Sequence, residues 1–407
     1  MPVPYTKIHN GKIITPTGIR EGTILICGKE IAEISDRDMD VPDAEEINAG
    51  GRYVSPGFID IHVHGGGGHD FMDNTVEAYL RVAETHARYG TTAMWPTTLT
   101  SDKEGIIQSV LTYDAAKDKN RDGAQFLGLH LEGPYFAMNQ RGAQDPRYIR
   151  DPDPAEYKEI LSHTASIKRW SAAPERKGAI EFGRHMVSQG ILPAIAHTDA
   201  VYEEALAAFR EGYTLATHFY SGMSGVTRRN AYRYAGVVEA GYLIDEMDVE
   251  IIADGAHLPA PLLQLIMKIK GPERTALITD AMRAAAMPEG DSMLGHKVNG
   301  MKVIVEDGVA KLPDRTAFAG SVATADRLVR TMVGHAGVSL HTAVRMISAT
   351  PARIAGVAGK KGELKKGMDA DIILFDDNIQ VSMTMIQGKV IYRHPGLNGS
   401  VQDGLPE

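Results

Sequence analysis

The sequence predicts an α/β fold, a (β/α)8 TIM-like barrel with a small β-sandwich domain built from both chain ends. Three observations predict it. Strand and helix patterns alternate through the middle of the chain, hairpin patterns occupy both ends, and histidines or carboxylates follow nearly every strand of the middle region. The chain has 407 residues. Because a barrel takes about 250 residues, a second small domain is expected.

The two ends of the chain share one pattern of short strands separated by turns. It is present in "TKIHNGKIITP" and "GTILICGKEIAEIS" near the start, and in "DADIILFDDN" and "VSMTMIQGKVIYRHP" near the end. The Asn-Gly and Gly-Lys pairs with alternating apolar residues are typical of hairpins. We therefore predict one β-sandwich domain from residues 1–55 and 359–407, and a barrel domain from residues 56–358.

The middle region contains eight apolar strand patterns with amphipathic segments between them, such as "VYEEALAAFREGY". In order, the strand patterns are "GFIDIHVH", "TTAMWPTT", "FLGLHLEG", "IKRWSAAPE", "ILPAIAHT", "TLATHFYS", "VEIIADG" and "TALITDA". Buried parallel strands require such near-continuous apolar runs. A doubly wound sheet is the main alternative, but a barrel better explains polar residues at the ends of nearly all strands.

Composition excludes several classes of protein. The formal charge of −9 comes from scattered carboxylates, so nucleic-acid binding through a basic surface is not expected. Cys27 is the single cysteine, which excludes a disulfide framework and a thiolate zinc site. The N-terminus has no signal-peptide pattern, and no run of about 18 apolar residues occurs. We expect a cytoplasmic protein without a membrane anchor.

Metal-ligating residue types gather at the predicted strand ends. A single histidine there is more often a structural residue with a hydrogen bond. Six strands with histidine or carboxylate at the same level are harder to explain in that way. The residues, in chain order, are His62, His64, His130, Glu132, His197, Asp199, His218, Asp254, His257 and Asp280.

The spacing of these residues suits a pair of divalent ions. Side chains two apart in a strand point the same way, so His62 and His64 can hold one ion. Glu132 can bridge to a second ion held by His197 and His218. Such a pair, about 3.5–4 Å apart, generates hydroxide from water and polarises a carbonyl. Asp280, which is also predicted as a metal ligand, would then accept a proton and pass it to a leaving group.

Several motifs carry a resemblance to a known family. The segments "GFIDIHVHG", "LHLEGPY", "AHTDA", "ATHFYSGM", "IADGAH" and "LITDAM" resemble the amidohydrolase superfamily, and more closely the N-acetylglucosamine-6-phosphate deacetylases. The resemblance covers almost the whole chain, including "FAGS" and the C-terminal "GELKKGMDADIILFD". This spaced set is far more specific than a lone His-x-His.

The resemblance implies removal of an acetyl group from an amino-sugar phosphate. Hydroxide would attack the acetamide carbonyl, and Asp280 would protonate the departing amine. Glu132, His197 and His218 match the metal site that all members use. Members with the first-strand pair, here His62 and His64, use two ions, with zinc or iron as the candidates. The resemblance also suggests a homodimer.

The resemblance also implies a set of substrate-binding residues. Arg229 and His257 match the phosphate-holding positions, although the arginine-rich "TRRNAYRYAG" could also be a solvated loop. The chain departs from the family at Gln144, where a histidine is usual, and at Ser221-Gly222, where Asn-Ala is usual. The full predicted set is Ala143, Gln144, Ser221, Gly222, Arg229, His257, Phe318, Ala319 and Gly320.

Two other functions remain open from the sequence. One is hydrolysis of a different amide, such as an N-acyl amino acid or a cyclic imide. The absence of a lysine placed for carbamylation at a strand end argues against the cyclic imide. The other is a non-catalytic sugar-phosphate-binding protein, which would need neither the ligand set nor Asp280.

The residues between the first strand and its helix have a structural interpretation. The run Gly65–Gly68 should let the chain turn sharply beside the site. Asp70 in this loop is expected to cap or turn the backbone and not to bind metal.

Overall fold

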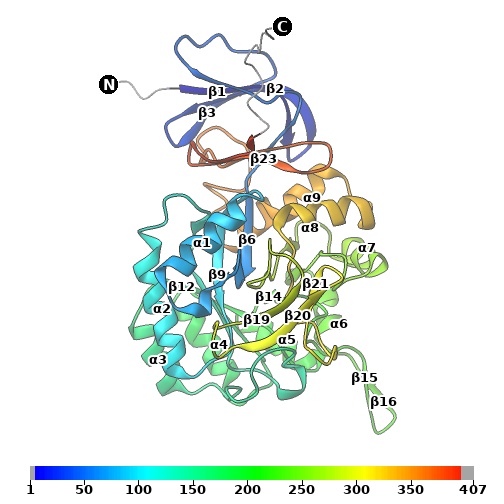
Figure 1. Cartoon of the computed structure of the whole chain (residues 1–407). Coiled ribbons are helices and arrows are strands. Elements are labelled where there is room, and N and C mark those ends of the chain that lie inside the picture. Colours follow the sequence, from blue (N-terminus) through cyan, green and yellow to red (C-terminus); the bar gives the residue numbers. More distant parts are fainter. Residues whose placement is uncertain (1–4, 396–407) are drawn as a thin grey trace.

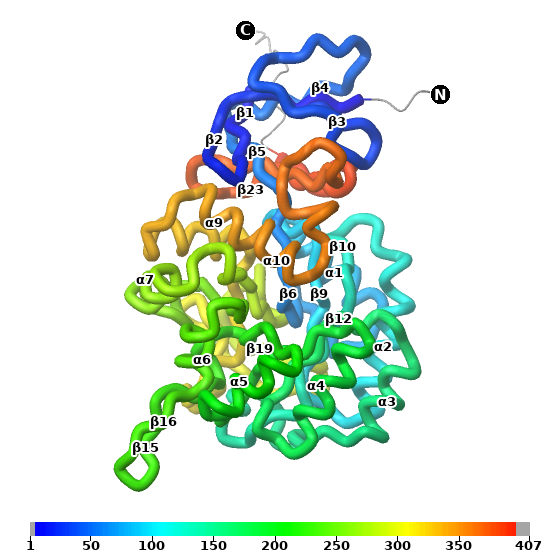
Figure 2. Tube along the Cα trace, turned by 180° about the vertical axis from the view of Figure 1, so that it is seen from behind, coloured from blue at the N-terminus to red at the C-terminus, as the bar shows by residue number. Residues whose placement is uncertain are grey.

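The computed structural model describes residues 5–395, which form a barrel with a smaller β-domain packed at one end (Figure 1). The tube in Figure 2, seen from behind, shows the same two parts. The predicted combination of a parallel barrel and a small β-domain drawn from both chain ends is confirmed. The predicted boundaries include residues 1–4 and 396–407, which lie outside the described part of the chain.

The small domain is one hydrogen-bonded sheet in the order β24-β23-β22-β5-β1-β2-β3, with β4 beside β1. The two chain ends meet where β5 and β22 pair antiparallel, with Pro56 opposite Ile372. Alternate apolar residues from both ends share a core that includes Ile13, Ile24 and Met383. Its strands are β1 (Tyr5–Thr15), β2 (Gly18–Cys27), β3 (Glu30–Ser35), β4 (Glu45–Asn48), β5 (Tyr53–Pro56), β22 (Ile372–Phe375), β23 (Val381–Ile386) and β24 (Lys389–Arg393).

One of the predicted hairpin turns is wrong. Gly28-Lys29 does join β2 to β3, as predicted. Asn10-Gly11, however, lies inside β1, where the pairing register with β2 shifts between Ile8 and Gly11. Asn10 takes a left-handed φ of 55° at this bulge. The bulge allows the first half of β1 to pair with β4 and the second half with β5, which outweighs the local turn preference.

All eight predicted barrel strands form, and the third is split in two. They are β6 (Phe58–Val63), β9 (Thr91–Thr98), β10 (Gln125–Phe126) with β11 (Leu129–Glu132), β12 (Ile167–Ala172), β13 (Leu192–Ile195), β14 (Leu215–Ala216), β17 (Asp248–Ile251) and β18 (Thr275–Leu277). The chain after β18 returns to β6, where the Asp280 amide donates to the His62 carbonyl at 2.9 Å. That contact brings the eighth strand back beside the first.

Helices follow the strands and cover the outside of the barrel (Figure 1). They are α1 (Val76–Ala87), α2 (Lys103–Lys117), α3 (Pro154–Ser162), α4 (Ala179–Ser188), α5 (Tyr202–Arg210), α6 (Val237–Leu243), α7 (Ala260–Ile269), α8 (Ala325–Thr331), α9 (Leu340–Ile347) and α10 (Ala349–Ile354), with the short turns η1 (Phe71–Asp73), η2 (Met138–Gln140) and η3 (Met332–Ala336). None of the helices in residues 5–395 has the length and apolar character needed to cross a bilayer.

Three small sheets are inserted between barrel elements. They are the pair β7 (Gly65–Gly66) and β8 (His69–Asp70), the pair β15 (Thr227–Arg229) and β16 (Tyr232–Tyr234), and the triple β19 (Gly290–Leu294), β20 (Met301–Glu306) and β21 (Val309–Lys311). In the first pair, Gly67 and Gly68 have φ values of 61° and 86°, as a sharp turn requires. Asp70 accepts a hydrogen bond from the Met72 amide and so caps η1, as expected.

The interior of the barrel is polar beneath the strand ends. Barrel interiors are usually filled by branched apolar side chains. Here several strands direct buried polar side chains toward one another, and these are linked by hydrogen bonds. They include Asp60, Thr97, His130, Arg169, Ser171, Thr217, Glu250 and Thr279. This network lies directly under the predicted metal ligands.

Candidate active site

The predicted catalytic residues meet at a cavity of about 210 Å³ at the carboxyl end of the barrel. Seven different connections contribute to its wall, so no single segment could form it. The lining residues are His64, Leu99, Glu132, Gly142, Ala143, Gln144, His197, His218, Ser221, Gly222, His257, Asp280, Leu294, Ala317, Phe318 and Gly320. Most of the predicted site residues are therefore brought together.

Backbone geometry aims three of these residues into the cavity. β13, β14 and β18 end two or three residues before His197, His218 and Asp280. These three residues have positive φ values of 47°, 30° and 47°. Left-handed backbone is uncommon for residues other than glycine and is often found at functional sites. The chain therefore turns out of each strand at the functional residue itself.

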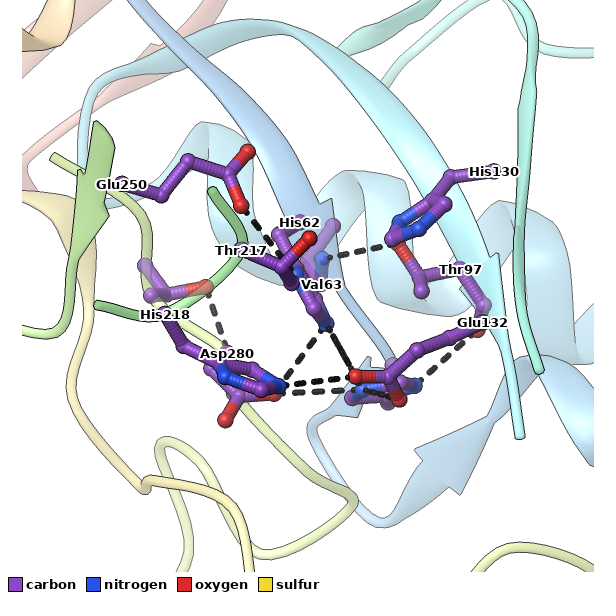
Figure 3. Close-up of polar contacts among 12 residues, drawn as sticks. His62, Val63, Thr97, His130, Glu132, Thr217, His218, Glu250 and Asp280 are labelled. Atoms are coloured by element: carbon purple, nitrogen blue, oxygen red, sulfur yellow. Dashed lines mark hydrogen bonds and ion pairs between the residues drawn. The ribbon is translucent and has the colours of Figure 1, made fainter. Parts of the chain in front are cut away.

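Two groups of potential metal ligands share Glu132. One comprises His62, His64 and Glu132, and the other comprises Glu132, His197 and His218. In each group the potential ligand atoms lie within 4.8 Å of one another. Glu132 Oε1 is 3.0 Å from Nε2 of His218 and 3.3 Å from Nε2 of His197. Asp280 Oδ1 lies 3.1 Å from Nε2 of His64 and 3.5 Å from Nε2 of His62. Figure 3 shows Asp280, His62, Glu132 and His218 grouped together.

Hydrogen bonds on the far side of three imidazole rings favour metal binding. Nδ1 of His64 faces the Thr97 carbonyl oxygen at 3.2 Å, Nδ1 of His197 faces the Gln140 carbonyl at 2.8 Å, and Nδ1 of His218 faces the Ser221 carbonyl at 3.0 Å. A carbonyl oxygen can only accept, so Nδ1 carries a proton and Nε2 is the ring atom left to hold an ion. Neutral imidazoles with a bridging carboxylate are a donor set that fits divalent zinc or iron.

The surroundings of the two site carboxylates, Glu132 and Asp280, favour their ionised form. Burial alone would raise the pKa of Glu132, but His62, His197 and His218 hold that pKa well below its ordinary value. Burial likewise opposes ionisation of Asp280, yet His62 and His64 lower its pKa. Charged carboxylates among imidazoles are what a metal site requires of its ligands before an ion arrives.

Gln144 is held at both ends of its amide. Its Nε2 donates to Glu132 Oε2 at 2.6 Å, and its Oε1 accepts from the Thr100 amide at 2.9 Å. The residue is buried. Gln144 therefore contacts a predicted metal ligand directly, in addition to lining the cavity.

The other end of the cavity is formed by His257 and Phe318. The two rings lie 4.6 Å apart, and Nδ1 of His257 donates to Asp254 Oδ2 at 2.8 Å. Backbone amides of Ala256 and His257 donate to Asp254 Oδ1, so the Asp254 carboxylate orients this loop. Ala319 is buried in an apolar cluster with Met282 and Leu294, although its neighbours Phe318 and Gly320 line the cavity.

Arg229 lies away from this cavity. It is on the projecting hairpin Thr227–Tyr234, which we call the Arg/Tyr arm and which extends from the body in Figures 1 and 2. Every residue of the arm is exposed. The Arg229 guanidinium lies over the Tyr234 ring at 5.4 Å and does not line the cavity. Arg229 and His257 are thus not brought together within one chain.

Sequence reasoning missed the residues beneath the site. Glu250 and Arg169 are fully buried and pair with each other under His62. Burial tends to raise the pKa of Glu250, but Arg169 beside it keeps that pKa below its ordinary value. The available signal was a charged residue at an inward-facing position of an apolar strand, Arg169 beside Lys168 in "IKRWSA" and Glu250 in "VEII". His130, in contrast, is not a ligand candidate, since its ring nitrogens face Thr97 and Ser171.

Comparison with known proteins agrees with this geometry. The profile of the amidohydrolase family matches residues 53–391. The chain is 35% identical to an N-acetylgalactosamine-6-phosphate deacetylase of Escherichia coli O157:H7, over 83% of this chain and 87% of the relative. It is 33% identical to an N-acetylglucosamine-6-phosphate deacetylase of Vibrio furnissii, over 86% of this chain and 85% of the relative.

A solved structure of similar shape supports the same assignment. The N-acetylglucosamine-6-phosphate deacetylase of Pasteurella multocida superposes with a TM-score of 0.88 at 27% identity, covering 95% of this chain and 99% of that one. The family profile spans the whole barrel and part of the small domain, and the relatives match over similar lengths. The chain belongs to the amidohydrolase family and, within it, to the N-acetylglucosamine-6-phosphate deacetylase family.

Proposed function

We propose that this enzyme hydrolyses the N-acetyl group of N-acetylglucosamine-6-phosphate, or of a close N-acetylhexosamine phosphate, to the amino-sugar phosphate and acetate. The observation that carries the proposal is the pair of ligand groups that share Glu132, with Asp280 beside them, at the carboxyl end of the barrel. The similarity to curated deacetylases over most of the chain supports it.

We propose two divalent ions, zinc or iron, for this site. His62, His64 and Glu132 would hold one, and Glu132, His197 and His218 the other, with Asp280 beside the first group. Bound there, such ions would lower the pKa of a water molecule and polarise the amide carbonyl.

Asp280 is the proton carrier in this proposal. The neighbouring histidines lower the pKa of this carboxylate, which favours the ionised form, and Asp280 lines the cavity. It could therefore accept a proton there. The same oxygen would then deliver the proton to the amine nitrogen as the carbon–nitrogen bond breaks. General acid–base catalysis of this kind contributes about 10²–10⁴-fold to a rate.

In this proposal, a second copy of the chain takes part in binding the substrate phosphate. His257, oriented by Asp254, would contact the phosphate from within the cavity. Arg229 cannot reach that cavity in its own chain, because it lies on the exposed Arg/Tyr arm. A homodimer in which each arm enters the neighbouring site would bring the guanidinium to the phosphate. Arginine suits this task, since it offers paired donors to phosphate oxygens.

The galactosamine epimer is the second candidate substrate. One curated relative at 35% identity is named for it. Gln144 and the Ser221-Gly222 pair, the positions at which the sequence resemblance implies a departure from the family pattern, line the cavity. The two-domain boundaries, the phosphate residues and a cytoplasmic location remain predictions.

Acetate release from a panel of N-acetylhexosamines, each with and without the 6-phosphate, tests this function. We expect rapid release from one phosphorylated epimer and little from the unphosphorylated sugars. Arg229→Ala should raise KM about 10–100-fold for phosphorylated sugars alone, as loss of a charged hydrogen bond predicts. Equal effects on unphosphorylated sugars would exclude phosphate as the target of Arg229, and no acetate from any sugar would exclude the proposed function.

A further inference from the structure

His62 is supported differently from the other three histidines of the site. The Nδ1 atoms of His64, His197 and His218 face backbone carbonyls at 2.8–3.2 Å. The Nδ1 of His62 is fully buried and has no hydrogen-bond partner among the described residues. Its nearest charged acceptor is Glu250 Oε2, at 3.6 Å. Figure 3 shows Glu250 on the opposite side of the His62 ring from Glu132 and Asp280.

Glu250 is itself fixed by a buried arginine. The Arg169 guanidinium donates from Nη1 to Glu250 Oε1, and from Nη2 to Oε2 at 2.8 Å. The guanidinium also donates to the Ile61 carbonyl at 3.2 Å and to Thr217 Oγ1 at 2.7 Å. The carboxylate under His62 is therefore tied through Arg169 to β6, to β12 and to the residue that follows β14, as well as to its own strand, β17.

A contribution to the stability of the fold does not by itself explain the ion pair between Arg169 and Glu250. Both side chains have no exposed surface. Burial of two charges is costly, and a buried pair is often replaceable by apolar residues without loss of stability. Metal-binding histidines, on the other hand, commonly donate their second ring N–H to a carboxylate, which fixes the tautomer and strengthens the ligand.

We infer that Glu250, held by Arg169, is a positioning residue for His62. It attracts the proton of His62 to Nδ1 and leaves Nε2 free, directed at Glu132 and Asp280, which lie 3.5 Å away. The His130 ring meets the His62 ring edge-on at 4.8 Å and restricts its rotation. The inference rests on the two-ion site of the proposed function, and it assigns the support of one ion only.

The hydrogen bonds of the histidine rings explain why loss of Glu250 should affect only one of the two ions. The Nδ1 atoms of His197 and His218 face backbone carbonyls, and their Nε2 atoms face Glu132. Among the described residues, neither Arg169 nor Glu250 makes a hydrogen bond to either ring. Loss of the Glu250 charge should therefore weaken the ion held by His62 and His64 and spare the ion held by His197 and His218.

Measurement of bound Zn²⁺ tests this inference. Full-length protein loaded with Zn²⁺ would be dialysed against a series of chelator-buffered Zn²⁺ concentrations, and zinc per chain would be measured. In Glu250→Gln, half-saturation of one ion should move to about 10–100-fold higher free Zn²⁺, the usual effect of removing a ligand's supporting partner. The other ion should stay unchanged.

Asp248→Asn is the matched control. Asp248 lies on the same strand β17, is buried, and pairs with Arg353 at 2.7 Å and 2.9 Å. The same carboxylate-to-amide change should lower the melting temperature and leave both ions in place. If Glu250→Gln behaves like Asp248→Asn in zinc binding, or if both ions weaken equally, the inference is overturned.

A second variant covers the case in which Glu250→Gln does not fold because Arg169 is left unpaired. The double variant Arg169→Met, Glu250→Gln removes both buried charges. It should show the same selective loss of one ion, and retention of both ions at the free Zn²⁺ that saturates the wild type would overturn the inference. Wild-type protein that binds fewer than two ions would refute the two-ion proposal itself, before any variant is compared.

Discussion

The two halves of the candidate metal site are built in different ways. In the half formed by His197 and His218, left-handed turns after β13 and β14 place the histidines, and backbone carbonyls orient their rings. In the half formed by β6, His62 and His64 follow ordinary strand alternation. His62 then depends on a buried side-chain pair, Glu250 with Arg169.

This difference has a consequence for how each half responds to mutation. A backbone carbonyl stays in place when its own side chain is replaced. A side-chain carboxylate is lost with a single substitution. The β6 half is therefore the more fragile one, and its loss would leave the Glu132, His197 and His218 group intact.

The largest expected effect on activity comes from Asp280, which interacts electrostatically with histidines of both halves. Asp280 Oδ1 lies 3.5 Å from Nε2 of His62. His62 and His64 lower the pKa of Asp280, and His218 lowers it further. Asp280→Asn should lower kcat by about 10²–10⁴-fold, because an amide cannot accept and return the proton. Zinc content should remain close to that of the wild type. Near-normal kcat with full zinc would show that another group carries the proton.

Replacing one histidine in each half tests directly whether each half holds its own ion. His62→Ala should lose one ion per chain and keep the second, since Glu132, His197 and His218 still form a complete group. His218→Ala should lose the ion of its own group. Zinc per chain, measured for both variants after equal dialysis, should fall from two to one in His62→Ala. Two ions retained in His62→Ala would remove β6 from the metal site.

The chain sequence was sufficient to predict the barrel and the ligand groups. The reason is physical: parallel strands buried on both faces need long apolar runs, and a barrel collects polar residues where those runs end. The pair His62 and His64, Glu132, and the histidines after the fifth and sixth strands were found in this way. They lie within one cavity wall or directly beneath it.

What the sequence could not predict depends on contacts between distant strands. Arg169 and Glu250 face each other only because β12 and β17 direct these side chains into the same barrel interior. Arg229 lies outside its own cavity because the Arg/Tyr arm projects, and the direction of a hairpin is set by packing that no local pattern records. The bulge at Asn10 likewise reflects partners on two other strands.

A smaller effect on zinc binding is expected for replacement of Gln144, because Gln144 contacts Glu132, the ligand that both groups share. Its amide donates to Glu132 Oε2, and Glu132 Oε1 faces His197 and His218. Gln144→Ala should weaken zinc binding about tenfold, the value of one hydrogen bond to a charged group. Asn139→Ala, in the same loop but bonded to Asp199, is the control and should bind zinc normally. Unchanged zinc binding in Gln144→Ala would limit Gln144 to contact with substrate.

The smallest change in zinc affinity is expected for Gln140→Ala, which leaves the backbone support of His197 in place. Gln140 supports His197 through its backbone carbonyl, at 2.8 Å from Nδ1, while its side chain bonds to Asp199. Gln140→Ala keeps the carbonyl and should change zinc affinity by less than about twofold, within the usual range for a surface substitution. Chelator-buffered zinc titration measures it beside Glu250→Gln. A shift in Gln140→Ala as large as that in Glu250→Gln would mean that side chains, and not the backbone, hold the His197 half in place.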